Sequence, residues 1–161
     1  MLNLFSCLKS FTLLEDSSPK AFTLLEILLV IGIISALLVA IIPMGLDFYK
    51  NQELSTQIQF LIQTLRRAQS KAMSIELDSP FGVRVNTQNY VLFKGTSYLT
   101  RDTPYDEVFD LPQIINSSGL SEVVFSKLEG KPNVTGNITL SSNNKSRTIN
   151  INDFGTVSLI P

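Results

Sequence analysis

A largely apolar run from residue 22 to residue 42 most constrains what this chain of 161 residues can fold into. Glu26 is the only ionisable side chain in the run. As an α-helix the run would be about 31 Å long, which is enough to cross the hydrocarbon core of a bilayer. A lone charged carboxylate costs about 3 kcal/mol near the middle of a membrane, and less near its edge. We therefore expect a membrane-spanning helix in which Glu26 needs a partner of opposite charge.

The residues around Glu26 resemble the signal of type IV prepilins and pseudopilins. That family has a small residue, usually Gly, then Phe or Met, then Thr-Leu-(Ile/Leu)-Glu and an apolar run. The matching residues here are Ala21, Phe22, Thr23, Leu24, Leu25 and Glu26. The resemblance implies that a prepilin peptidase cuts between Ala21 and Phe22 and methylates the new Phe22 amine. Ala21 in place of Gly departs from the usual pattern and predicts slower processing.

The sequence Phe-Thr-Leu-Leu-Glu of residues 22–26 also occurs once upstream, at residues 11–15. The polar segment 16–19 follows that copy and ends in a proline, so no membrane helix can continue from it. We therefore interpret residues 1–21 as a leader and the second copy as the working signal.

Cleavage would give Phe22 a free amine with a reference pKa of about 7.7–8, largely protonated at neutral pH. Opposite charges attract strongly in a phase of low dielectric constant, and removal of one leaves the other unpaired. Glu26 of an incoming subunit is thus expected to pair with Phe22 of a subunit already in the fibre. A plain signal-anchor helix whose Glu26 reaches the interface is the alternative. A secretory signal peptide would need a small-x-small cleavage site, which residues 43–47 do not provide.

Lys9 and Lys20 are offset by Glu15 and Asp16, so charge alone orients the helix weakly. The resemblance implies a single-pass inner-membrane protein with its head outside the cytoplasm, and later a periplasmic or extracellular filament. The partners implied are prepilin peptidase, other pilin or pseudopilin subunits, an inner-membrane assembly platform and, before assembly, membrane lipid.

The amino-acid composition limits which catalytic and metal sites the chain can form. The chain has no histidine, and its one cysteine, Cys7, lies in the predicted leader. Ser-His and Cys-His catalysis and the common zinc sites are therefore excluded. We expect no enzyme, no cofactor and no metal site, and a membrane-anchored hydrolase is disfavoured. The net charge of -1 offers no general attraction to nucleic acid.

The helix is predicted to continue beyond the membrane, from Leu46 to about Ile75, without Gly or Pro. Pro43 lacks an N–H group and should kink the helix. One face is apolar and should be buried, through Leu54, Ile58, Leu61, Leu65, Ala68, Ala72 and Ile75. The opposite face, which should lie in solvent, carries Gln57, Gln63, Arg66, Arg67, Gln69 and Lys71.

After residue 79 the apolar period changes from about 3.6 to two, which is typical of strands. Strands are predicted at 81–85, 90–94, 108–111, 123–125, 136–140, 148–151 and 156–160, with turns at 86–89 and 141–145. About eighty residues of short strands bury little by themselves, so the head should pack on the apolar helix face. The predicted fold is α+β, a pilin-like lollipop. Its parts are the leader 1–21, the membrane half 22–45, the amphipathic half 46–79 and the head 80–161.

The head also resembles minor pilins of the GspH/FimT type. The resemblance rests on residues 125–130, 136–140, 149–152 and 155–157, together with the helix segment 65–72. Some members of that group bind DNA through basic residues in the head. The corresponding candidates here are Lys127, Lys131, Lys145 and Arg147, although acids nearly balance the bases of the head.

Four acids lie between residues 101 and 110, and some pseudopilins bind calcium through an acidic loop. The spacing fits no EF-hand, so a solvated loop is expected instead. Taken together, the sequence predicts a minor pilin or pseudopilin that is a structural subunit of a type IV pilus or a type II secretion pseudopilus. A DNA-binding or adhesive minor pilin that acts in DNA uptake is the alternative.

Overall fold

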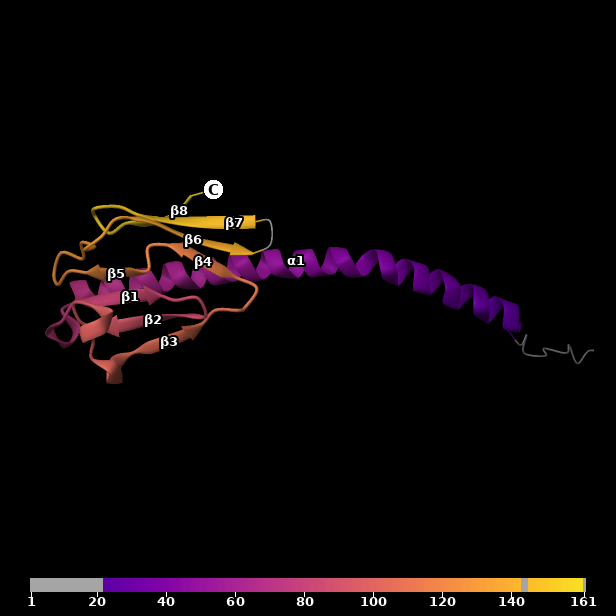
Figure 1. Ribbon diagram of the computed structural model, residues 1–161, viewed down its shortest axis with the longest axis horizontal. Coiled ribbons are helices and arrows are strands. Elements are labelled where there is room, and N and C mark those ends of the chain that lie inside the picture. Colours follow the sequence, from indigo (N-terminus) through magenta and orange to yellow (C-terminus); the bar gives the residue numbers. More distant parts are fainter. Residues whose placement is uncertain (1–21, 143–144, 161) are drawn as a thin grey trace, which may run out of the picture. The chain divides into compact units, whose positions relative to one another are not determined.

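The computed structural model describes residues 22–142 and 145–160, except for the side chains of residues 40–44. A single long helix, α1 (Leu24–Met73), precedes the strands (Figure 1). The chain divides into two units, one that ends at Ile42 and one that begins at Pro43. The second unit contains the C-terminal half of α1 and every strand of the described residues.

The C-terminal half of α1 buries one face, as its periodicity predicts. The side chains at this face are nearly inaccessible to solvent and comprise Leu54, Ile58, Leu61, Ile62, Leu65, Ala68 and Ala72. Ile75 was predicted to belong to this face, and that prediction is wrong. The helix ends at Met73, the Ile75 N–H donates to the Ala72 carbonyl, and Ile75 turns into the left-handed region with φ 56°. Its side chain is therefore 41% exposed.

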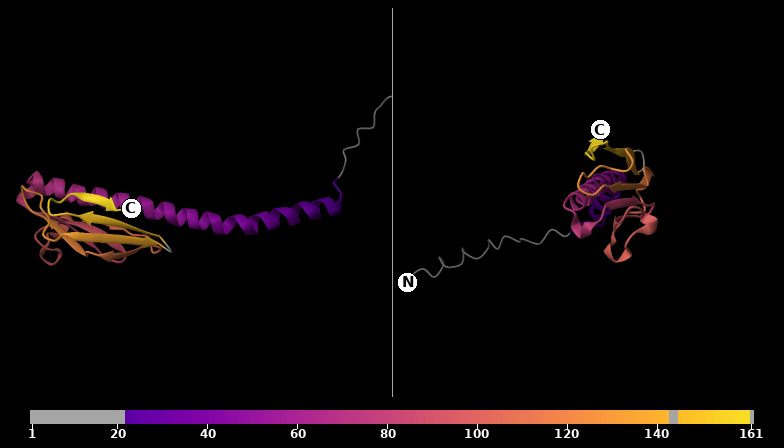
Figure 2. Two further views of the ribbon diagram at one scale, coloured as in Figure 1. Left: turned by 90° about the horizontal axis from the view of Figure 1, so that it is seen from above. Right: turned by 90° about the vertical axis from the view of Figure 1, so that its left-hand side faces the viewer.

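The strands form two antiparallel sheets that both lie along this helical half (Figures 1 and 2). Sheet A has the order β3-β2-β1-β5, with β1 at Phe81–Val85, β2 at Asn89–Lys94, β3 at Glu107–Asp110 and β5 at Glu122–Phe125. Sheet B has the order β4-β6-β7-β8, with β4 at Asn116–Gly119, β6 at Gly136–Ser142, β7 at Lys145–Ile151 and β8 at Val157–Ile160.

Alternate residues of both sheets complete the core against α1. In sheet A, Val83 lies between Leu92 of β2 and Val123 of β5, and all three are buried. Sheet B contributes Ile138, Leu140, Ile149, Ile151 and Val157. Its outer face carries polar cross-strand pairs, of which Asn150 donates to Asn137 at 2.8 Å. The period of two thus separates a buried face from a solvated one.

The seven predicted strands are present, with ends shifted by up to three residues. β4 was missed because Asn-Ser-Ser-Gly has little strand propensity; it forms by backbone pairing with β6. The turn predicted at 141–145 overlaps both strands, since β6 continues to Ser142 and β7 already begins at Lys145. Asn143 and Asn144 lie outside the described residues.

Besides the main core, a smaller cluster of packed side chains covers the outer face of sheet A. Phe93 is fully buried there, over Gly82, and Tyr98 packs edge-on against it with ring centroids 5.7 Å apart. Tyr98 belongs to η2 (Tyr98–Thr100), a 3₁₀ turn that precedes η3 (Thr103–Tyr105). The segment between β2 and β3 is therefore a folded cap on this sheet.

Candidate assembly site

The residues predicted to act in assembly, Phe22 and Glu26, lie at the N-terminal end of α1. Phe22 and Thr23 precede the helix, and Glu26 lies in its first turn. The Glu26 N–H donates to the Thr23 hydroxyl at 3.2 Å, and the Ile27 N–H donates to the Thr23 carbonyl at 3.2 Å. A carboxylate is favoured at this end of a helix, where the unpaired N–H groups leave partial positive charge. Ala21, the predicted cleavage residue, lies outside the described residues.

The N-terminal capping by Thr23 was not recognised in the sequence, although a signal was present. Thr-Leu-Leu-Glu, residues 23–26, matches the capping-box pattern S/T-x-x-E/Q. The pattern was assigned only to processing and assembly. The structure adds a local role, because the Thr23 side chain marks where the helix begins.

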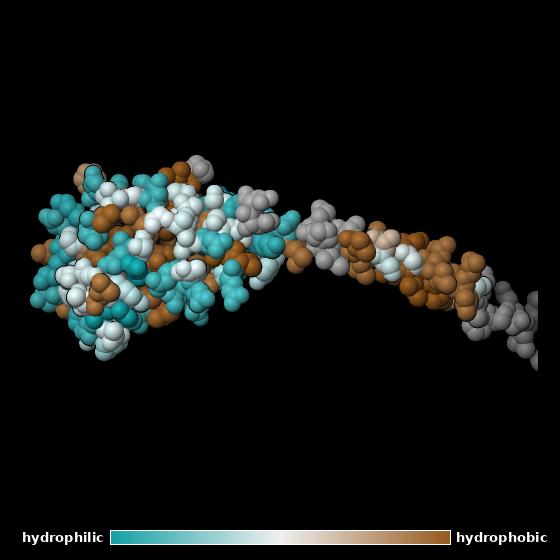
Figure 3. Space-filling view, viewed as in Figure 1, coloured by the Kyte–Doolittle hydropathy of each residue, from teal (hydrophilic) through white to brown (hydrophobic). Residues whose placement is uncertain are grey.

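The first unit displays apolar side chains to solvent along its described length (Figure 3). Their exposed fractions lie between 45% and 83%, and the residues are Phe22, Leu24, Leu25, Ile27, Leu28, Leu29, Val30, Ile31, Ile33, Ile34, Leu37, Leu38 and Val39. Apolar surface of this extent is typical of an interaction site. No helix of the described residues meets the length and hydropathy that a membrane crossing requires. The membrane-spanning role of residues 22–45 stays a prediction.

Pro43 is the first residue of the second unit. The helical assignment of α1 runs across this position, and the Pro43 side chain is outside the described ones. The predicted kink stays a prediction.

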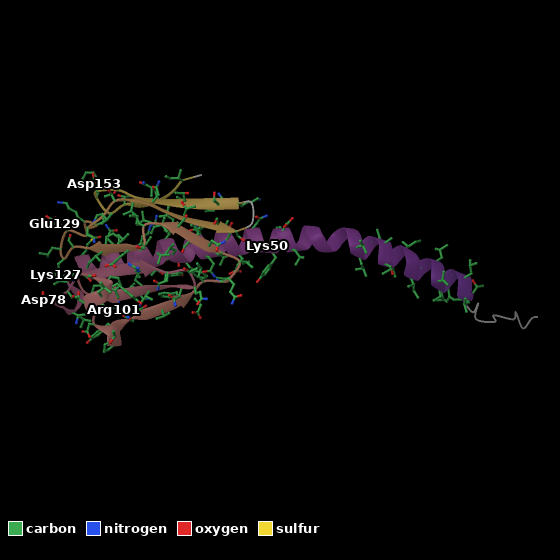
Figure 4. All side chains as sticks on the ribbon, in the orientation of Figure 1. Lys50, Asp78, Arg101, Lys127, Glu129 and Asp153 are labelled. Carbon is green, nitrogen blue, oxygen red and sulfur yellow. The ribbon has the colours of Figure 1, made fainter. Side chains whose placement is uncertain are left out.

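Two of the four basic residues considered for DNA contact lie in the loop between β5 and β6. Lys127 contacts Asp78 at 2.6 Å, and Lys131 contacts Glu129 at 3.0 Å. Figure 4 shows Lys127, Asp78 and Glu129 at one end of the second unit. The hydrogen bond and the charge of Lys127 lower the pKa of the Asp78 carboxyl below its usual value. Both ammonium groups thus already have an anion beside them.

The other two basic residues considered for DNA contact, Lys145 and Arg147, lie in the first half of β7. Lys145 pairs with Ser142 at the end of β6, whereas the loop that holds Lys127 and Lys131 precedes the start of β6 at Gly136. The seven residues of β6 span about 20 Å between these ends. The structure therefore does not gather the four into one basic stripe, and DNA contact stays a prediction.

The acidic loop is exposed to solvent at residues 102–105, in line with the expected solvated loop, and two of its carboxylates pair with basic residues. Asp102 pairs with Lys94 at 3.2 Å, and Asp106 pairs with Arg101 at 2.7 Å. The Asp106 hydrogen bond raises the pKa of Arg101. The Arg101 guanidinium also lies 3.8 Å from the centre of the Tyr98 ring. These carboxylates hold the cap on sheet A and have cationic side chains as their partners.

On the basic flank of α1, Arg66 and Arg67 are exposed to solvent as predicted and Lys71 is half-buried, and all three also make polar contacts with the head. Arg67 pairs with Glu107 of β3 at 2.8 Å, and Lys71 reaches the same carboxylate at 3.7 Å. Arg66 donates to the Val157 carbonyl of β8 at 3.1 Å. Both sheets are therefore joined to the helix by polar contacts as well as by the core.

Comparison with solved structures shows which known fold the chain shares. The chain matches the solved structure of the minor pseudopilin EpsH from the type 2 secretion system of Vibrio cholerae, with a TM-score of 0.52. The match covers 67% of this chain and 96% of that chain. The chain has the fold of a minor pseudopilin.

Sequence identity over this match is 14%, so the likeness concerns the fold. No protein-family model and no curated protein sequence matches the chain. The pseudopilin resemblance seen in the sequence is thus confirmed for the long helix and its antiparallel sheets.

Proposed function

We propose that this protein is a minor subunit of a type II secretion pseudopilus or a related type IV pilus. The observation that carries the proposal is the exposed apolar segment 22–39 on a chain with the minor pseudopilin fold. Such a surface must be covered, first by lipid and then by the helices of neighbouring subunits. The role is structural, and no catalytic step is assigned to this chain.

The proposed pathway begins in the inner membrane, with residues 22–45 as the single span and the head outside the cytoplasm. Prepilin peptidase hydrolyses the Ala21–Phe22 bond and methylates the Phe22 amine. An assembly platform then extracts the subunit into a periplasmic or extracellular filament. In the filament the Phe22 ammonium of one subunit pairs with Glu26 of the next. The pairing removes two unpaired charges from a phase of low dielectric constant.

A role in DNA uptake has less support. Lys127 and Lys131 each have a carboxylate within 3.0 Å, and β6 separates them from Lys145 and Arg147. A phosphate-binding surface needs clustered positive charge that is free to release counterions. Salt-dependent retention of DNA by the fragment 45–161 would favour the DNA-uptake function.

The intact mass of the membrane-expressed protein tests the proposal, with and without a co-expressed prepilin peptidase. We expect loss of residues 1–21 and the gain of one methyl group only when the peptidase is present. Ala21→Glu should abolish both changes, because the peptidase needs a small residue there. An unchanged wild-type mass with a competent peptidase would indicate a plain signal-anchored protein and overturn the proposal.

A further inference from the structure

Most cationic side chains of the second unit already have a partner. Arg66 donates to the Val157 carbonyl at 3.1 Å. Seven others lie within 3.3 Å of a carboxylate, namely Arg67, Lys71, Arg84, Lys94, Arg101, Lys127 and Lys131. Among the described residues, only Lys50, Lys145 and Arg147 take part in no ion pair and are the remaining cations.

These three unpaired cations lie where the facing surfaces of α1 and sheet B run beyond the core. Lys145 and Arg147 are exposed at the start of β7, on the strand face that holds the buried Ile149 further along. Lys50 is half-buried on α1, about one turn before the buried Leu54. Figure 4 shows Lys50 and the start of β7 at the same end of the second unit.

Two acids lie near Lys50 along the helix and do not cancel the positive charge at this end. Asp47 precedes Lys50 by three residues and Glu53 follows it by three. Neither belongs to an ion pair of the described residues. The Gln57 amide donates to the Glu53 carboxylate at 2.9 Å. Three cations against two acids leave this end positive and able to attract an anionic surface.

Exposed apolar side chains adjoin Lys50 in the same helical turn. Leu46, Phe48 and Tyr49 are 56%, 71% and 61% exposed. Tyrosine and lysine both have an apolar body and a polar tip, and both are typical of the boundary between a membrane and water. The turn 46–50 therefore has the composition of a membrane interface, next to the cations of β7.

The length of α1 places this turn at the depth of lipid headgroups. The proposed membrane half ends at residue 45, and α1 continues through Lys50. Five helical residues rise about 7.5 Å. The headgroup region is about 5–8 Å thick on each side of a bilayer, and a lysine stem can bend back toward it.

We propose that this end of the second unit is a docking surface for anionic phospholipid. Phe48 and Tyr49 lie at the boundary of the acyl chains, and Lys50, Lys145 and Arg147 bind the phosphates of the headgroups. The contact holds the head on the outer surface of the inner membrane until the subunit is extracted. The inference rests on the proposed function, since it requires residues 22–45 to span the membrane.

The test is the acetylation rate of individual lysines, measured by peptide mass spectrometry on the full chain in lipid nanodiscs. Discs of phosphatidylcholine are compared with discs in which about a quarter of the lipid is phosphatidylglycerol. We expect Lys50 and Lys145 to react about fivefold more slowly in the anionic discs. At about 1 M NaCl the rates should recover, because salt screens exposed charges. Lys127 and Lys131, at the opposite end, should react equally in both discs.

Arg147→Gln tests whether the three cations act together. It removes one charge, which is expected to weaken docking about fivefold. The acetylation rate of Lys145 in anionic discs should then approach its rate in neutral discs. Lys131→Gln is the matched control, because it removes an exposed cation at the other end, and it should leave the protection of Lys145 unchanged.

Four outcomes would overturn the inference. Equal rates in both discs, for a chain that prepilin peptidase still cleaves, would remove it and leave the proposed function intact. Equal protection by inorganic phosphate in neutral discs would indicate a site for free phosphate. Protection by duplex DNA in neutral discs, without protection by phosphatidylglycerol, would assign these cations to DNA contact. A chain that does not enter the discs would remove the proposed membrane span and the inference together.

Discussion

Gly82 shows how closely a single residue can be constrained by tertiary packing. A Cβ atom at this position would lie 2.6 Å from the Phe93 ring and 2.9 Å from both the Val123 carbonyl and the Val124 side chain. The ring is fully buried under the cap on sheet A, so it has little room to move. The sequence pattern predicts a strand at Gly82 and gives no sign of this requirement.

We expect Gly82→Ala to lower the free energy of unfolding by about 1–3 kcal/mol, because extra volume in a packed cluster strains its neighbours. Gly45→Ala is the matched control, since Gly45 is helical and a Cβ there would contact nothing within 4 Å. It should raise the free energy of unfolding by about 0.5–1 kcal/mol. Denaturant unfolding measures both, and a loss of similar size in the two variants would contradict this packing.

The element with the most unusual backbone is the segment that follows α1. Ile75, Leu77 and Asp78 have left-handed φ angles between 51° and 56°, and Leu128 in the adjacent loop has φ 69°. These are all the non-glycine residues with positive φ in the described part of the chain. The Leu128 N–H donates to the Ala72 carbonyl, and Lys127 pairs with Asp78. Long-range contacts therefore hold a conformation that the local sequence disfavours.

The ion pair of this element predicts a pH dependence. Lys127 lowers the pKa of Asp78 below the reference value of 3.8, through a hydrogen bond and through its charge. A carboxyl whose pKa is lower in the folded state stabilises the fold above its unfolded pKa, and this contribution is lost as the pH falls through the folded pKa. The stability difference between wild type and Lys127→Met should therefore be constant from pH 7 to about pH 4 and shrink below it.

Urea unfolding of both proteins as a function of pH measures this difference. Lys50→Met is the control, because none of the ion pairs of the described residues includes Lys50, and it should show no such change below about pH 4. If the difference in the free energy of unfolding between wild type and Lys127→Met stayed constant down to about pH 2, the Lys127–Asp78 ion pair would be contradicted.

On the scale of the whole molecule, the second unit depends on α1. Seven buried side chains of the helix lie in the same core cluster as residues of both sheets. Neither sheet could cover its apolar face without them, because each is a small four-stranded sheet. The helical half from residue 46 is thus part of the head's core rather than only its stalk.

We expect the fragment 45–161 to unfold in one cooperative transition. The fragment 74–161 lacks the buried helix face and should show no such transition. Circular dichroism during denaturant unfolding distinguishes the two fragments. Cooperative unfolding of 74–161 would show that the strands have a sufficient core of their own.

Much of the fold and part of the candidate site could be predicted from local pattern. The spacing of Leu54, Ile58 and Leu61 predicts the buried helix face, and alternation predicts the strand 81–85. Asn116–Gly119 could not be predicted, because that strand forms by backbone pairing with β6. Ile75 continues the apolar period and yet leaves the core, because the helix ends two residues earlier.

The sequence by itself determined the features that depend on neighbours within about one helical turn. These are the exposed apolar segment, the helix start at Thr23 and Glu26, and the periodicity of the elements. Only the tertiary structure decided which charges meet: Arg67 pairs with Glu107, forty residues away, and Lys127 with Asp78. Such pairs depend on how the sheets fold back on the helix, and many acids and bases in one chain could satisfy the same local pattern.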